Sequence, residues 1–112
     1  IVGLEGAVAA CERLDVPLIP VGGLGENLLI EGLGDLGDIE PGDLVRIVPE
    51  GVTLPAVVLV ARKQNEPCAN LRIYHRLMPK ELFGKRGVIC TVEKEGTVHA
   101  GDRVDLVRAP HD

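Results

Sequence analysis

The sequence predicts a mainly β fold with one or two short helices, and its composition carries this prediction. Glycine and proline supply 22 of the 112 residues, which does not suit a bundle of long helices and favours short strands joined by turns. Valine, leucine and isoleucine supply 37 residues, so the chain has the apolar side chains for a core and does not resemble a disordered tail. We expect a single domain over residues 1–112 that folds without disulfide or metal staples.

One short helix is predicted near the N-terminus, over residues 6–14. Ala7, Cys11 and Leu14 recur there at the i, i+4, i+7 spacing that places side chains on one helix face. Proline cannot continue a helix, so Pro17 is expected to end it.

Apolar runs and alternation predict the strands. Residues 56–61 (AVVLVA) form a continuous apolar run of strand length, which is typical of a strand buried on both faces. Alternation, which marks a strand with one covered face, occurs in two later segments. The other expected elements are a short β-like segment at 27–31, a strand at 44–48, one or two helical turns ending near Phe83, a strand at 87–92 with Val88, Cys90 and Val92 on one face, and a strand at 103–107 with Val104 and Leu106 pointing inward.

Two segments 59 residues apart contain a Gly-Asp turn followed by a predicted strand. Residues 39–48 (IEPGDLVRIV) and 98–107 (VHAGDRVDLV) are identical at four of ten positions. We interpret them as one turn used twice in a closed or nearly closed sheet. The competing interpretation is that Gly-Asp is simply a common turn pair, and the sequence favours neither.

Composition and charge exclude several functions. One Phe, one Tyr and no Trp are too few for a platform that stacks single-stranded nucleic acid, and a net charge of −5 disfavours binding to duplexes. The chain contains no serine, which excludes a serine nucleophile. No apolar run approaches the roughly 20 residues of a membrane span, and the N-terminal segment lacks the features of a signal peptide. We expect neither nucleic acid nor a membrane as a partner.

The cysteines and histidines do not form a metal site of their own. Three cysteines without CxxC spacing are not a disulfide framework, so a reducing cytoplasm is the expected compartment. His75, His99 and His111 lack the spacing of a zinc site. A soft metal that arrives with its own cofactor needs only one protein thiolate, and such a site remains compatible with the sequence.

The basic residues concentrate in one segment. The 25 residues from Arg62 to Arg86 hold seven basic and two acidic side chains, in a chain of net charge −5. This segment either holds an anionic ligand or is a solvated surface. Cys68 lies inside it, directly after Pro67, and neighbouring cations favour the thiolate that binds metals or attacks electrophiles. The alternative is a small buried thiol, which is the expected state of Cys11 and Cys90.

A glycine-rich loop precedes the segment at 27–31. Residues 22–25 (GGLG) resemble a phosphate-binding loop, but the third glycine of GxGxxG is absent and no GK[ST] follows. A simple glycine-rich turn is therefore favoured over a backbone cradle for an anion. Asn27 beside this loop could bond either its own backbone or a ligand.

Several motifs occur in a fixed order along the chain: Gly-Glu-Asn-Leu at 25–28, a Gly-Asp turn at 42–43, Asn-Glu-Pro-Cys-Ala-Asn-Leu at 65–71, Gly-Lys-Arg-Gly-Val at 84–88, and Glu-Gly-Thr-Val at 95–98 followed by Gly-Asp at 101–102. In this order they resemble the MOSC domain, the C-terminal module of molybdenum-cofactor sulfurases, which also occurs in the mitochondrial amidoxime-reducing component and in bacterial stand-alone proteins. The resemblance covers roughly residues 20–107.

The resemblance implies a small barrel-like MOSC-type fold in an N-terminally shortened, stand-alone member of the family. It implies binding of the molybdenum cofactor (molybdopterin, an anionic pterin), with Cys68 as the metal ligand or the catalytic sulfur carrier. Glu26 and Asn27 match the motif that lines the family's site. Arg72 and Arg86 of the basic segment would suit the cofactor's phosphate. A second copy of the chain could complete a shortened pocket, so a homo-oligomer is an expected partner.

Two other functions compete with this one. A truncated, non-catalytic β-barrel could serve as an interaction or structural protein, and it would expose an apolar patch where the missing segment packs. A redox-sensing protein could use the Cys68 thiol alone. A thiol pKa near the free value of about 8.5 would contradict both the cofactor and the redox hypotheses.

Overall fold

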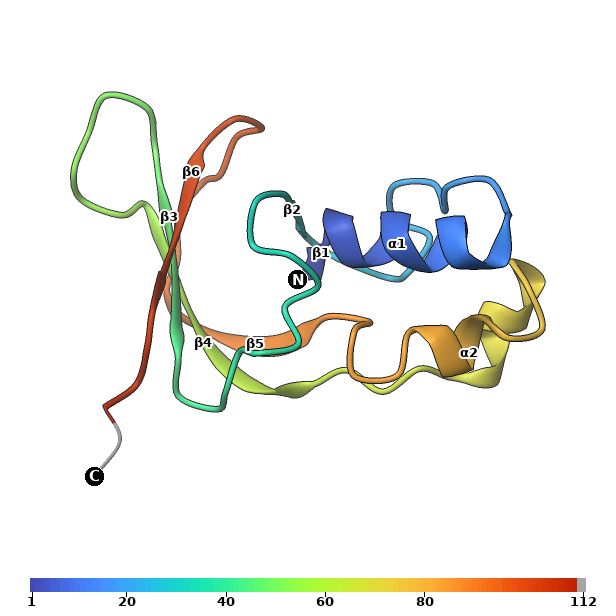
Figure 1. Cartoon of the computed structure of the whole chain (residues 1–112). Helices are drawn as coiled ribbons and strands as arrows, with labels where there is room; N and C mark the ends of the chain where they lie inside the picture. The colour runs from blue at the N-terminus through green and yellow to red at the C-terminus, as the bar shows by residue number, and fades with distance from the viewer. Residues whose placement is uncertain (111–112) are drawn as a thin grey trace. The chain divides into compact units, whose positions relative to one another are not determined.

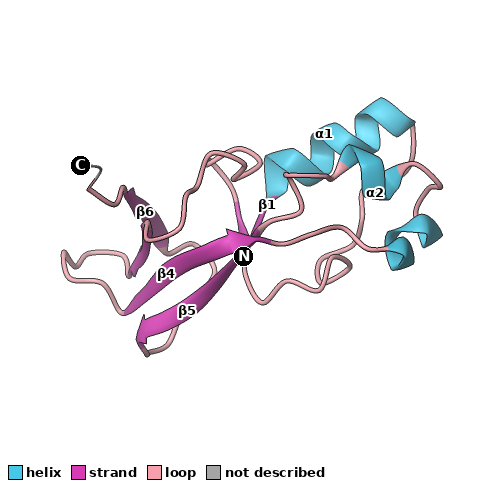
Figure 2. Cartoon of the chain, turned by 90° about the horizontal axis from the view of Figure 1, so that it is seen from below, coloured by secondary structure: helices cyan, strands magenta, loops and turns pink. Residues whose placement is uncertain are grey.

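The computed structural model describes residues 1–110, which divide into two compact units. The first unit contains Ile1–Asp38 and Gln64–Val88, and the second contains Ile39–Lys63 and the chain from Ile89 onward. The helices of the described chain lie in the first unit, whereas the second is built on a four-stranded sheet (Figure 1, Figure 2). Among residues 1–110, no helix has the length and apolar character needed to cross a bilayer.

The first unit packs its helices over a small apolar core. Its elements are β1 (Val2–Gly3), α1 (Leu4–Leu14), β2 (Leu29–Ile30), the 3-10 helix η1 (Ala69–Ile73) and α2 (Met78–Glu81). β1 pairs in parallel with β2, and α2 contacts both α1 and η1. One cluster of buried side chains in this unit consists of Val2, Ala7, Ala10, Cys11, Ile19, Leu24, Leu71, Met78 and Leu82.

The predicted N-terminal helix is confirmed as α1, which begins two residues earlier than expected. Ala7 and Cys11 are buried and Leu14 is partly buried, as their spacing predicts. The helix ends before the first proline, because Asp15 adopts the left-handed conformation (φ 53°) and the N–H of Val16 donates to the Cys11 carbonyl at 3.0 Å. This Schellman-type end satisfies a carbonyl that a helix terminus otherwise leaves unpaired.

The second unit is built on a sheet with the strand order β5-β4-β3-β6. These strands are β3 (Leu44–Val48), β4 (Val57–Gln64), β5 (Val88–Lys94) and β6 (Arg103–Val107). β3 is antiparallel to both β4 and β6. β5 and β6 are the end strands, so the sheet is open, and β1 with β2 forms a separate pair. The expected barrel is not confirmed, because closure needs paired edges and roughly five strands or more. Over residues 1–110, the fold is a small, sheet-rich one with two α-helices.

Burial along β4 corrects the prediction of a strand covered on both faces. Val57, Leu59 and Ala61 are buried, whereas Val58 and Val60 are only half-buried. The strand therefore has one fully covered face. A continuous apolar run does not show which face a neighbouring layer covers, since both faces of such a run are equally apolar.

The two end strands are covered less than alternation predicts. In β5, Val88 is buried and Cys90 is half-buried, but Val92 is 62% exposed. In β6, Val104 and Leu106 are half-buried. Alternation shows which residues share a face, but it does not show where along an end strand the covering layer stops.

The repeated Gly-Asp segments form the same turn twice. The N–H of Glu40 donates to Asp43 Oδ2 at 2.9 Å, and the N–H of His99 donates to Asp102 Oδ2 at 2.8 Å. In both turns the glycine before the aspartate has a left-handed φ, of 93° and 94°, which is a conformation that glycine adopts without steric cost.

The pairing of β3 with β6 relates these two segments by a local twofold. Arg46 faces Asp105 in the antiparallel register, and these two residues are 59 apart, the same spacing that separates the two turns. A rotation about this twofold axis places each strand on the position of the other. The two Gly-Asp turns therefore lie at opposite ends of the strand pair. The interpretation of one turn used twice is confirmed, although in an open sheet rather than a closed one.

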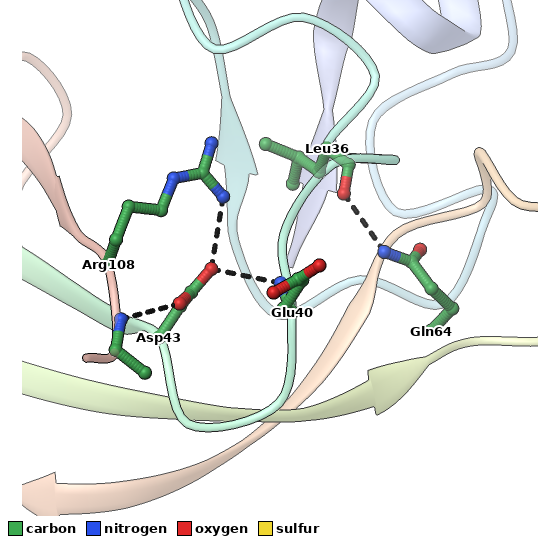
Figure 3. Close-up of polar contacts among 6 residues, drawn as sticks. Leu36, Glu40, Asp43, Gln64 and Arg108 are labelled. Atoms are coloured by element: carbon green, nitrogen blue, oxygen red, sulfur yellow. Dashed lines mark hydrogen bonds and ion pairs between the residues drawn. The ribbon is translucent and has the colours of Figure 1, made fainter. Parts of the chain in front are cut away.

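Asp43 differs from its counterpart Asp102 because it is fully buried. Its carboxylate accepts hydrogen bonds from the N–H of Ala109 (2.8 Å), the N–H of Glu40 (2.9 Å) and Arg108 Nη1 (3.0 Å) (Figure 3). The N–H of Ala109 and then that of Glu40 lower the Asp43 pKa, with Arg108 assisting, against the opposing effect of burial. The ionised carboxylate thus fastens the chain after β6 to the start of β3.

Candidate functional site around Cys68

Cys68 lies in the segment that connects β4 to η1. Gln64, at the end of β4, donates from Nε2 to the Leu36 carbonyl at 3.0 Å (Figure 3), and the N–H of Asn65 donates to the Gly87 carbonyl at 2.9 Å. These bonds hold the start of the segment. The Cys68 backbone is extended (φ −121°) and directly precedes η1, and the residue is exposed.

The side chain of Arg86 reaches Cys68 from a later part of the first unit. Arg86 Nη1 donates to the Glu66 carbonyl at 2.9 Å and to Cys68 Sγ at 3.6 Å. Arg86 Nη2 donates to the Leu24 carbonyl at 3.3 Å. The guanidinium therefore joins the glycine-rich loop, the cysteine segment and the residues that precede β5.

The position of Arg86 depends on the glycine that follows it. Gly87 has a φ of 129°, which L side chains rarely adopt, and a Cβ at this position would collide with the Ile1 carbonyl oxygen. The same Ile1 carbonyl accepts the N–H of Val88 at 2.9 Å. Only glycine permits this close passage of two chain segments, which fixes the backbone from which Arg86 projects.

The surroundings of Cys68 favour its thiolate. The peptide N–H of Asn70 lowers the pKa of the Cys68 thiol most, and the Arg86 guanidinium lowers it further, against a smaller opposing effect of desolvation. Burial instead raises the pKa of the Cys90 thiol on β5, and Cys11 lies in the core of the first unit. Cys68 is thus exposed with a lowered thiol pKa, Cys90 is half-buried with a raised one, and Cys11 is buried.

Two side chains of the basic segment hold the glycine-rich loop. The Tyr74 hydroxyl donates to the Gly23 carbonyl at 2.8 Å. Arg86 donates to the next carbonyl, that of Leu24. The loop that leads to Glu26 is therefore tied to the same segment that carries Cys68.

The loop itself is a turn rather than an anion cradle, as its missing third glycine indicates. The N–H of Gly23 donates to the Pro20 carbonyl at 2.8 Å, and the N–H of Gly25 donates to the Gly22 carbonyl at 3.0 Å. Gly22 and Gly25 have positive φ values of 86° and 77°, for which turns select glycine. These amides already have partners within the loop and do not need a ligand.

Two buried polar atoms near this loop have no partner among residues 1–110. They are Glu26 Oε1 and Arg86 Nε. Buried polar atoms without a partner are rare in folded proteins, and each calls for an ion, a water or a ligand as an explanation. Glu26 Oε1 is an acceptor and Arg86 Nε is a donor. Asn27, the residue after Glu26, is exposed.

Arg72 is not in contact with the thiol. It lies on η1, four residues after Cys68, and it is exposed, as are Arg76 and Lys80 further along the segment. Of the predicted site residues, the structure joins Cys68 to Arg86 and leaves Arg72 in solvent.

Several groups around the thiol had no sequence signal. The carbonyls of Leu24 and Glu66 and the N–H of Asn70 are backbone groups, which every residue carries. Tyr74 lies 51 residues from its partner Gly23. The one available hint is that Tyr74 is the only tyrosine of the chain.

Within residues 1–110, no three His, Cys, Asp or Glu side chains gather into a metal site. His75 Nδ1 accepts the N–H of Leu77 at 3.0 Å, a local contact, and His111 lies outside the described residues. A metal bound at Cys68 would therefore have to bring its other ligands with it.

Comparisons with known proteins identify the family. A Bacillus subtilis (strain 168) protein named for metal-sulfur cluster biosynthesis, YuaD, is 28% identical over 117 residues, a match that covers 95% of this chain and 58% of that protein. The crystal structure of the Bacillus subtilis YuaD protein has the same fold, with a TM-score of 0.81 and 23% identity over 97% of this chain and 63% of that one. The chain thus spans less than two thirds of this relative's length. The MOSC domain family matches residues 5–105, which include parts of both units, and the chain belongs to this family.

Proposed function

We propose that this protein is a sulfur-carrier module that binds the molybdenum cofactor through the Cys68 thiolate. The observation that carries the proposal is the exposed Cys68 sulfur, 3.6 Å from the Arg86 guanidinium. A thiolate beside a cation is both a soft metal ligand and a nucleophile. Membership of the MOSC domain family, and the relative's name, which refers to metal-sulfur cluster biosynthesis, support a role in sulfur or metal chemistry.

The chemistry of the predicted site residues fits a pterin cofactor that carries a phosphate. Cys68 offers the single thiolate that a cofactor-borne molybdenum needs. The buried, unpartnered Glu26 Oε1 is an acceptor that suits the N–H groups of a pterin. Arg72 and Asn27 are exposed donors for the phosphate and the polar edges of the ring. When bound, the cofactor would supply a metal that exchanges oxygen and sulfur ligands.

Cys68 would carry sulfur as a persulfide. Its thiolate attacks the outer sulfur of a donor persulfide, R–S–SH. The S–S bond of the donor breaks, a new S–S bond forms at Cys68, and the donor leaves as the thiolate R–S⁻. The outer sulfur moves with its proton, so no external oxidant or reductant is needed. Arg86 favours the attacking anion before the transfer.

Expression in a host that makes the cofactor tests the metal part of the proposal. The purified protein should contain molybdenum and pterin in equal amounts, measured by elemental analysis and by the fluorescence of the oxidised pterin. Cys68→Ala should lose the molybdenum while its circular dichroism stays unchanged, and the matched variant Cys90→Ala should keep it. Stoichiometric molybdenum in Cys68→Ala, or none in the wild type, would contradict cofactor binding at Cys68.

Incubation with a small persulfide donor tests the sulfur part. Peptide mass spectrometry should find one added sulfur atom on the Cys68 peptide and none on the peptides of Cys11 or Cys90. Transfer that favours another cysteine, or no transfer, would contradict the carrier role.

A second function, as a non-catalytic interaction or structural protein, has one observation in its favour. Val21, Ile73 and Phe83 of the first unit are 82%, 80% and 76% exposed, and large exposed apolar side chains are typical of contact surfaces when they are contiguous. Light scattering after size exclusion separates the two functions. The interaction function would be favoured if the protein is an oligomer that contains no cofactor and if Phe83→Glu dissociates that oligomer.

A further inference from the structure

We propose that the solvent-exposed side of the segment from η1 to α2 docks an acidic protein that delivers sulfur to Cys68 as a persulfide. The inference rests on the proposed function, because it takes Cys68 as the sulfur acceptor, and it adds the kind of partner that the acceptor needs. This surface, the η1–α2 face, consists of Arg72, Ile73, Arg76, Leu77, Lys80 and Phe83.

The residues of the η1–α2 face lie on one side of the segment. They fall at positions 72–73, 76–77, 80 and 83, and all of them are exposed. Leu71, Met78 and Leu82 of the same segment are buried in the core cluster of the first unit. Spacings of three and four residues place side chains on one side of a helical segment. The N–H of Met78 donates to the His75 carbonyl at 3.0 Å, and α2 contacts η1, so the face is the side that points away from this core cluster.

The η1–α2 face combines large apolar side chains with unpaired cations. Ile73 is 80% exposed and Phe83 is 76% exposed. Among residues 1–110, no carboxylate forms an ion pair with the three cations of the face. Residues 69–80 contain no Asp or Glu, and Glu81 is already paired with Arg13 at 2.6 Å. The face thus keeps three free positive charges in a chain whose net charge is −5.

This combination fits a protein surface that is rich in carboxylates around an apolar centre. The cores of protein–protein interfaces are enriched in aromatic and arginine side chains. Exposed apolar side chains are typical of a contact surface when they are contiguous. Complementary charge raises the rate of encounter and fixes the orientation of the partner. An acidic partner would neutralise the three cations, and its apolar centre would cover Ile73 and Phe83.

The position of the η1–α2 face beside Cys68 indicates that the partner is the sulfur donor. Cys68 is exposed and directly precedes η1, and its sulfur accepts the peptide N–H of Asn70. A 3-10 helix rises about 2 Å per residue, so Ile73 lies roughly 10 Å from Cys68 along the segment. A contact of about 800 Å² on each partner, the usual size, is large enough to cover both residues.

The chemistry of the transfer favours a protein over other anionic surfaces. The outer sulfur of the donor persulfide must touch the Cys68 sulfur, and the donor then leaves as the thiolate R–S⁻. A protein that carries the persulfide must therefore also cover the residues around Cys68. An anionic membrane or a nucleic acid could cover the η1–α2 face, but it would supply no sulfur.

Matched peptide persulfides test the docking. Each peptide carries a cysteine persulfide between leucines, and its other positions are all Glu, all Gln or all Lys. Peptide mass spectrometry follows the sulfur added to Cys68. At low salt, the Glu peptide should transfer sulfur about tenfold faster than the Gln peptide, and the Lys peptide should be slowest, because complementary charge speeds encounter. High salt should remove most of this difference, since it screens exposed charges.

Variants of exposed residues separate docking from the reactivity of the thiol. Arg76→Gln combined with Lys80→Gln should reduce the advantage of the Glu peptide to about threefold or less. The matched control, Lys94→Gln combined with Arg103→Gln, removes an equal charge from β5 and β6 and should keep the advantage. Ile73→Ser should slow transfer from the peptides about fivefold. Free cysteine persulfide, which needs no docking surface, should react with every variant at the wild-type rate.

The possible failures are distinguishable. A Glu peptide that is no faster than the Gln peptide would overturn the partner, and so would an advantage that survives the loss of Arg76 and Lys80. Binding to phosphatidylserine vesicles that the same double variant abolishes would assign the face to a membrane instead. A wild-type oligomer that Ile73→Ser dissociates would assign it to a second copy. If cysteine persulfide itself adds no sulfur to Cys68, the carrier role is overturned together with the partner.

Discussion

The Arg86 guanidinium lies 3.6 Å from the Cys68 sulfur, although 18 residues separate the two in the chain. The contact depends on the carbonyls of Leu24 and Glu66, which orient the guanidinium. It also depends on Gly87, which lets the backbone after Arg86 pass close to Ile1. The environment of the thiol is therefore a product of several chain segments, and each contribution can be measured.

Cys68 should be the first cysteine to react with a thiol reagent at neutral pH. The pKa of Cys68 is lowered by the Asn70 N–H and by Arg86, the pKa of Cys90 is raised by burial, and Cys11 is buried. Brief treatment with iodoacetamide should label Cys68 at least about tenfold faster than either of the others, because the thiolate is the reacting form. Faster labelling of Cys90, measured by peptide mass spectrometry, would contradict the assigned environments.

Loss of the buried carboxylate of Asp43 should destabilise the second unit. Asp43→Asn removes the anion that binds Arg108 and weakens two bonds from peptide N–H groups. The free energy of unfolding should fall by about 2–3 kcal/mol, because the Arg108 side chain is 45% exposed and its share is screened. Asp102→Asn is the matched control, since Asp102 makes the equivalent bond to His99 but is not fully buried. That change should cost about 1 kcal/mol or less. Equal losses in urea unfolding would show that the extra contacts of Asp43 contribute nothing.

The contribution of Asp43 should disappear in acid. Its pKa is lowered in the folded chain, so the carboxylate stabilises the fold fully above the unfolded-state pKa of about 3.9 and loses that effect as the pH falls through the lower, folded-state pKa. The difference in unfolding free energy between the wild type and Asp43→Asn should be constant near neutral pH and shrink below about pH 4. Urea unfolding across a range of pH measures this difference in unfolding free energy. If the difference grew as the pH fell, the expected lowering of the Asp43 pKa on folding would be contradicted.

Gly87→Ala should disturb the Cys68 site through the backbone. The added Cβ would meet the Ile1 carbonyl at a φ of 129°, so we expect a loss of about 2–3 kcal/mol in unfolding free energy. Gly84→Ala is the control, because Gly84 also has a positive φ (75°) but has open space at its Cβ position, and it should cost about 1 kcal/mol. Alkylation of Cys68 should slow in Gly87→Ala only. An unchanged rate of Cys68 alkylation in Gly87→Ala would show that the backbone at Gly87 does not determine the position of Arg86.

The sequence by itself determined the local elements and the identity of the thiol. The buried face of α1, the strands β3 and β6, and the shared Gly-Asp turn depend on periodicity and turn chemistry, which involve residues a few positions apart. Cys68 stood out from Cys11 and Cys90 for the same reason, since its polar and basic neighbours lie in the same short segment.

Only the tertiary structure decided which basic residue contacts the Cys68 sulfur and whether the sheet is open or closed. The segment from Arg62 to Arg86 contains seven basic residues, both end residues included, and charge cannot rank them. Arg72, four residues from Cys68, lies in solvent, whereas Arg86 contacts the sulfur because distant carbonyls hold it. The tertiary structure also decided that the sheet is open, because its edge strands depend on which strands pair with one another. The physical reason is that contacts between remote segments require loop closure and the packing of a whole unit, and a local pattern contains neither.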